Sequence, residues 1–131
     1  MCSSGGLDFI RVFSETVFDV AKENVIGTEA EYGYKDGKLL RTGQILGGLA
    51  LGPGKPSHIF SRTGRMPALA GGNMDIDIEM FEVSKFAILV NHDDPDREFK
   101  YTKGAEKARV KAKELGWTIV NMKKDWNTVF T

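Results

Sequence analysis

The sequence predicts an α/β fold with a mostly parallel sheet, and two observations lead to that prediction. Short apolar runs of strand length occur at 67–70, 86–90 and 117–122. Segments whose apolar residues have helical spacing lie among them, and such alternation is typical of parallel sheets flanked by helices. We therefore expect a Rossmann-like three-layer α/β/α sandwich in the order helix, hairpin, helix, strand, helix, strand, helix, strand.

Length and charge restrict the classes of protein that are possible. The 131 residues, 41% of them hydrophobic, suffice for a single domain spanning 1–131. The 18 basic and 18 acidic side chains cancel, so nothing indicates a nucleic-acid partner. Cys2 is the only cysteine, and no long apolar span suggests a membrane, so we expect a cytoplasmic protein. Cys2 is either a reactive thiol or a partly buried residue at the end of a strand.

The N-terminal third predicts a helix followed by a hairpin. Apolar residues at Ile10, Phe13, Val17 and Val20 have the spacing of an amphipathic helix over 7–22. Its start lies beside Ser3 and Ser4, where free N–H groups bind phosphate or, equally, Ser4 caps the helix. Segment 25–41 contains the turn pair Asp36-Gly37, which is typical of a β-hairpin.

A glycine-rich segment, 45–55, leads to Lys55 and is expected to be a loop that brings this lysine to a site. Pro56 then starts a short helix that Gly64 closes. On this helix His58 is expected at the surface. Arg62, like Arg65 beyond the helix, either binds phosphate or is solvated.

The strand at 67–70 is bounded by Gly71-Gly72 and opens onto a loop that carries Asn73, Asp75 and Asp77. Ligands bind beyond the carboxyl ends of parallel strands, and three oxygen-bearing side chains suit Mg²⁺. The alternative is that Asn73 and Asp75 cap a helix that begins near Ile76.

The strand at 86–90 is followed by the polar segment 91–96, which is interpreted either as a ligand rim that supplements the metal site or as an Asx-type turn. A helix over 101–115, stopped by Gly116, precedes the last strand at 117–122. Trp126 and Phe130 are expected to fold back on the core.

Three motifs together resemble the C-terminal part of a haloacid dehalogenase-superfamily phosphatase. Ser3 in CSSGGLDFIRVFSE resembles the second motif of that family, Lys55 in GPGKP the third, and the turn Gly72-Asn73-Met74-Asp75-Ile76-Asp77 the acidic fourth. The stretches LVNHDDPDREFKY and GWTIVNMKKDWNTVF match a bacterial branch of the family, so the resemblance covers nearly the whole chain.

The resemblance implies hydrolysis of a phosphorylated small molecule. Lys55 and Ser3 are then the catalytic residues and bind the phosphoryl oxygens with Ser4, while Asn73, Asp75 and Asp77 hold Mg²⁺. The hairpin at 25–41 is the only segment that corresponds to the family's cap, which shapes substrate choice. Asn73 stands where the family has a carboxylate, so Mg²⁺ binding is expected to be weak.

The family's nucleophile motif DxDxT does not occur in these 131 residues. We therefore expect the chain to be inactive alone, and its central strand to be replaced by self-association, a swapped dimer, a rearranged sheet or a complementing N-terminal segment. The alternative is a non-catalytic relative of the family that acts by self-association or by binding a partner.

Overall fold

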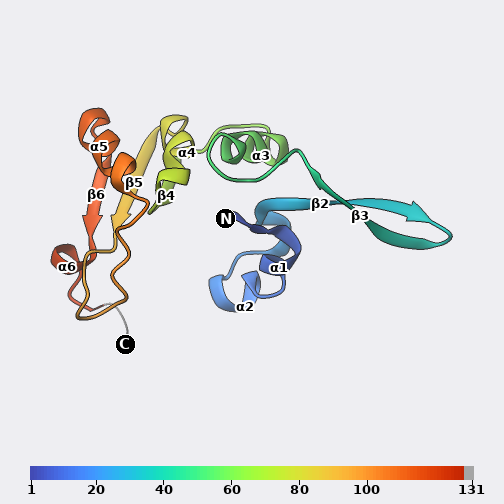
Figure 1. Ribbon diagram of the computed structural model, residues 1–131, viewed down its shortest axis with the longest axis horizontal. Coiled ribbons are helices and arrows are strands. Elements are labelled where there is room, and N and C mark those ends of the chain that lie inside the picture. The colour runs from blue at the N-terminus through green and yellow to red at the C-terminus, as the bar shows by residue number, and fades with distance from the viewer. Residues whose placement is uncertain (129–131) are drawn as a thin grey trace. The chain divides into compact units, whose positions relative to one another are not determined.

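The computed structural model describes residues 1–128, and the chain divides between Met66 and Pro67 into two compact units. We call them the N-terminal unit and the C-terminal unit and describe each by itself (Figure 1). Each unit contains one three-stranded sheet with helices beside it. The mixed α/β class is thus confirmed, whereas a single domain over 1–131 stays a prediction.

The sheet of the N-terminal unit has the order β1-β2-β3. Strand β1 (Cys2–Gly6) runs parallel to β2 (Ile26–Lys35), which pairs antiparallel with β3 (Lys38–Leu46). Asp36 and Gly37 both have positive φ, 52° and 78°, as a two-residue hairpin turn requires. The hairpin is confirmed, but it extends beyond the expected end at Arg41, and Figure 1 shows it as a long projecting arm.

The continuous helix expected over 7–22 is wrong. The segment forms α1 (Leu7–Arg11), α2 (Ser14–Phe18) and a 3-10 turn η1 (Lys22–Asn24). Asp19 ends α2 with a left-handed φ of 51°. The segment is rich in β-branched and aromatic residues, whose side chains lose rotamer freedom in a helix, so the breaks cost little helix stability.

The core of the N-terminal unit is small. Leu7, Ile10 and Val25 are buried together, and Phe13 and Val20 pack against them. Val17, expected on the buried face, is 62% exposed.

Helix α3 (Gly54–Thr63) packs against β1 and β2 in the same unit. It ends at Gly64 with a left-handed φ of 69°, as predicted from the sequence.

The sheet of the C-terminal unit is entirely parallel, in the order β4-β5-β6. Strand β5 (Phe86–Asn91) and strand β6 (Thr118–Asn121) lie where the sequence predicts them. Strand β4 (Leu69–Gly72) starts two residues later than expected, because Pro67 has no N–H for the ladder. The two glycines expected in the loop instead pair with Ile88 and Leu89.

Three helices and one 3-10 turn complete the C-terminal unit. They are η2 (Asp75–Asp77), α4 (Ile78–Glu82), α5 (Glu106–Leu115) and α6 (Met122–Asp125). The helix expected from residue 101 begins only at Glu106, because Tyr101 pairs with His92 and Gly104 has a φ of 81°. Gly116 ends α5 as predicted, with a φ of 71°.

The larger core lies in the C-terminal unit, where Phe81 and Leu89 are each 1% exposed. Phe81 meets Trp117 edge to face at 5.1 Å between ring centroids. The expected burial of Trp126 is wrong, since its side chain is 48% exposed and its backbone carbonyl is what Arg97 binds. Phe130 lies outside the described residues.

Candidate functional site

Ser3 and Ser4, the candidate phosphate-binding hydroxyls, lie on β1 and are half-buried. The Ser3 Oγ accepts the N–H of Gly5 at 3.1 Å. Ser4 does not cap α1, because Gly6 is the N-cap residue and no side chain caps this helix. The cap alternative is therefore wrong. Because α1 has only five residues, its dipole is weak and the helix adds little to an anion site.

Lys55 lies in the first turn of α3 and is 5% exposed. It is buried on the same helix as Ile59, four residues on, so both side chains lie on the inner face of α3. The glycine before it is required by a close approach: a Cβ on Gly54 would lie 1.9 Å from the carbonyl oxygen of Leu49. The glycine-rich segment therefore folds tightly against the start of α3, and Lys55 lies in that helix and not in the expected loop. That this segment brings Lys55 to a site stays a prediction.

The candidate metal loop follows the carboxyl end of β4 in the C-terminal unit. Asp77 is 4% exposed, and its Oδ2 accepts the backbone N–H groups of Asn73 and Met74, both at 3.0 Å. A Cβ on Gly72 would lie 2.6 Å from the same oxygen, so only glycine lets the carboxylate reach back over the strand end. Asp77 thus holds the loop closed.

Asp75 links this loop to the next helix. Its Oδ1 accepts the N–H of Ala108 at 2.8 Å, in the first turn of α5, and its own N–H donates to the carbonyl of Gly104 at 2.7 Å. The capping alternative is therefore wrong for the helix near Ile76: the Asp75 carboxylate instead accepts an N–H in the first turn of α5. Asn73 takes part in the loop by donating its backbone N–H to the Asp77 carboxylate.

The same loop is the candidate site for a hard cation. Carboxylate oxygens have two lone pairs each, so the Asp75 Oδ1, which accepts one N–H, can still coordinate a metal, whereas the Asp77 Oδ2 already accepts two. The Asn73 amide and the Asp75 and Asp77 carboxylates are the candidate ligands, and Mg²⁺ binding by them stays a prediction. Within residues 1–128, however, no group of three or more His, Cys, Asp or Glu side chains is arranged to hold a metal ion.

The polar segment after β5 is a closed turn. Asp94 is 1% exposed, and its Oδ1 accepts the N–H groups of Asp96 at 3.0 Å and Arg97 at 3.3 Å. Its other oxygen pairs with the Arg97 guanidinium, which holds the pKa of Asp94 below its usual value. Asp93 accepts the N–H of Lys123 at 3.0 Å. The Asx-turn interpretation is confirmed, because these carboxylates bind backbone and arginine.

Arg97 also fastens this turn to the C-terminal segment. Its two terminal nitrogens donate to four backbone carbonyls, those of Met122, Lys123, Trp126 and Asn127.

The candidate residues are thus divided between the units, with Ser3, Ser4 and Lys55 in the first and Asn73, Asp75 and Asp77 in the second. A common site that contains both sets stays a prediction.

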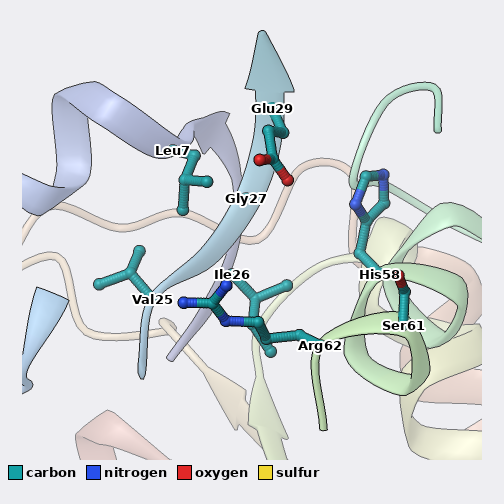
Figure 2. Close-up of a pocket in the computed structure, with 8 residues that line it drawn as sticks. All are labelled: Leu7, Val25, Ile26, Gly27, Glu29, His58, Ser61 and Arg62. Carbon is teal, nitrogen blue, oxygen red and sulfur yellow. The ribbon is translucent and has the colours of Figure 1, made fainter. Parts of the chain in front are cut away.

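The N-terminal unit contains a pocket that is not among the sites predicted from the sequence. This pocket has a volume of about 130 Å³, its floor includes the buried Leu7 and Val25, and its polar rim consists of Glu29, His58, Ser61 and Arg62. Figure 2 shows Glu29 on the strand side and the other three rim residues on the helix side.

Two spacings in the sequence show which lining residues share one side of β2 and which share one face of α3. Val25, Gly27 and Glu29 alternate along one side of the chain at β2, and His58, Ser61 and Arg62 follow the i, i+3, i+4 pattern of one helix face. Neither spacing reveals that the two faces meet, which depends on how α3 packs against β2.

Comparisons with known proteins do not assign the chain to a family, because no family model and no curated protein matches it. Across the part of the chain that the structure describes, none of the helices combines the length and apolarity needed to cross a membrane.

Proposed function

We propose that the chain is the phosphate- and metal-binding part of a Mg²⁺-dependent phosphohydrolase of the haloacid dehalogenase superfamily, with the three-layer fold of that family. The observation that carries the proposal is the oxygen-rich loop Asn73–Asp77, placed directly after a strand of a parallel sheet. The carboxyl ends of parallel strands are where α/β proteins bind ligands. The family resemblance of the Ser3, Lys55 and Asp77 motifs supports it.

In this proposal the residues of the chain divide the task by their charge. Lys55 and the Ser3 and Ser4 hydroxyls bind the phosphoryl oxygens of a phosphorylated small molecule. Asn73, Asp75 and Asp77 hold Mg²⁺, which when bound neutralises negative charge on the phosphoryl group. The DxDxT nucleophile is not among the 131 residues, so this chain by itself has negligible turnover.

Inorganic phosphate tests the anion site. Titration of the ¹⁵N-labelled chain with phosphate is expected to shift the amide signals of β1 and the start of α3, and Lys55→Met is expected to weaken binding by about tenfold or more. Lys35→Met, at the exposed end of β2, is the matched control. Equal affinity in wild type and Lys55→Met, with both spectra well dispersed, contradicts the proposal.

Calorimetry with Mg²⁺ tests the metal site. Asn73→Asp adds a charged oxygen ligand and is expected to strengthen binding, whereas Asp77→Asn is expected to weaken it. If neither substitution changes the affinity, the loop serves only to cap α5 and to close on itself.

The alternative function is self-association without catalysis, and one observation favours it. Every residue of β3 is exposed, including Leu39 at 68% and Leu46 at 50%. Exposed apolar strands at a sheet edge pair readily with other chains. Light scattering coupled to gel filtration tests this: we expect a dimer or larger assembly, and a mass near 14.5 kDa at high micromolar concentration contradicts it.

A further inference from the structure

The rim of the pocket between β2 and α3 contains one carboxylate and one guanidinium. Glu29 extends from β2, and Arg62 from the facing side of α3 (Figure 2). Ser61 and His58 lie beside them on the helix. A second hollow of about 190 Å³ shares Glu29, His58 and Ser61 and continues toward Leu46 at the end of β3.

The strand side of the pocket suits a cation. Within residues 1–128, no hydrogen bond or ion pair is made by the Glu29 carboxylate, which is half-buried. His58 is oriented by the contact of its Nε2 with the carbonyl of Gly48 at 3.1 Å, so Nδ1 of the neutral ring is an acceptor. A carboxylate, a ring nitrogen and the Ser61 hydroxyl are the acceptors that an ammonium group needs.

The helix side suits an anion. The Arg62 Nε and Nη2 donate to the carbonyl of Glu23 at 3.1 and 2.7 Å, which fixes the plane of the guanidinium. Of its five N–H groups, those on Nη1 are not used in these two contacts. They are available to a carboxylate, and a held guanidinium loses little entropy on binding one.

Size and charge together select the ligand. A pocket of about 130 Å³ is smaller than the roughly 300–1,000 Å³ typical of sites for drug-sized molecules. A ligand with one charge leaves the opposite pocket charge uncompensated, whereas a zwitterion satisfies both. We propose that this pocket binds a small α-amino acid, with its ammonium group at Glu29 and its carboxylate at Arg62. The inference goes beyond the proposed function and does not depend on it.

Three compounds of similar size test the proposal on the unmodified chain, without Mg²⁺ or phosphate. L-Alanine has both charges, propionate lacks the ammonium group, and ethylamine lacks the carboxylate. In titrations of the ¹⁵N-labelled chain, L-alanine is expected to shift the amide signals of β2 and α3 saturably. Each analogue is expected to bind about tenfold or more weakly, because each loses a charge-assisted contact.

A matched pair of variants then tests the assigned residue. Glu29→Gln is expected to weaken L-alanine binding by about tenfold. Glu31→Gln removes the same charge two residues along β2, outside the pocket, and is expected to bind as wild type. The proposal is overturned if L-alanine causes no saturable shift, if either analogue binds equally well, or if a well-folded Glu29→Gln retains full affinity.

Discussion

The two units use their acidic side chains differently. In the C-terminal unit, Asp75 and Asp77 after β4 and Asp93 and Asp94 after β5 all accept backbone N–H groups. In the N-terminal unit, Glu29 makes no such bond within the described residues and faces a pocket. What distinguishes the two kinds of carboxylate is whether a turn or helix start presents unsatisfied N–H groups within reach.

The difference teaches that a carboxylate after a parallel strand also serves the structure of the loop that carries it. A short loop between a strand and a helix leaves several N–H groups without partners, and Asp is the residue that satisfies them most readily. The proposed Mg²⁺ site at Asn73–Asp77 would therefore share oxygens with the hydrogen bonds that close the loop. The Glu29 carboxylate, by contrast, makes no hydrogen bond to the backbone within the described residues.

The largest effect is expected in the N-terminal unit, from Gly54→Ala. The new Cβ would lie 1.9 Å from a backbone oxygen, that of Leu49, so the loop before α3 must move. We expect a loss of about 3 kcal/mol or more in the free energy of unfolding, measured by urea denaturation. Gly6→Ala is the control, because nothing lies within 4 Å of a Cβ there. Equal stability of the two variants contradicts the close approach.

The next effect is expected in the C-terminal unit, from Asp94→Ala. The substitution leaves Arg97 without its carboxylate and opens the turn that fastens the C-terminal segment. We expect the urea midpoint to fall by about 1 M, while Asp96→Ala, whose side chain is 77% exposed, stays close to wild type. If both variants unfold at the wild-type midpoint, the turn does not stabilise this unit.

Gly72→Ala tests whether Asp77 serves the loop structure. Its Cβ would lie 2.6 Å from the Asp77 carboxylate, which must turn away and lose its bonds to Asn73 and Met74. A loss of about 1–3 kcal/mol in the free energy of unfolding is expected. The neighbouring Gly71→Ala has nothing within 4 Å of its Cβ and should change stability by less than about 0.5 kcal/mol. If Gly72→Ala and Gly71→Ala lower the free energy of unfolding by similar amounts, the structural role of Asp77 is contradicted.

The smallest effect is a pH dependence in the C-terminal unit. Because Arg97 lowers the pKa of Asp94 in the folded chain, this carboxylate contributes stability that is present above its unfolded value of about 3.9. The contribution is lost as the pH falls through the lower, folded value. Urea midpoints measured from about pH 5 to pH 3 should therefore decline less steeply in Asp94→Asn than in wild type. If the urea midpoints of the two proteins decline equally steeply with falling pH, the contribution of Asp94 to this pH dependence is contradicted.

Much of the fold was predictable because its signals are local. The apolar run of β5, the Asp36-Gly37 turn and the glycines that end α3 and α5 each act within a few residues. The sequence also indicated which loops are polar, and it predicted the turn after β5 as one of two alternatives. The prediction from the sequence was wrong over 7–22, where the apolar spacing is helical but many of the residues are poor helix formers.

Only the tertiary structure decided what the polar residues do. The sequence by itself determined the hairpin, the strands β5 and β6, the ends of α3 and α5, and the acidic loop after β4. It could not determine that Asp75 caps α5, thirty-three residues away, or that Glu29 and Arg62 share one pocket. Both depend on contacts between elements distant in the chain, and such contacts follow from how helices pack on strands, which no local pattern of residues records.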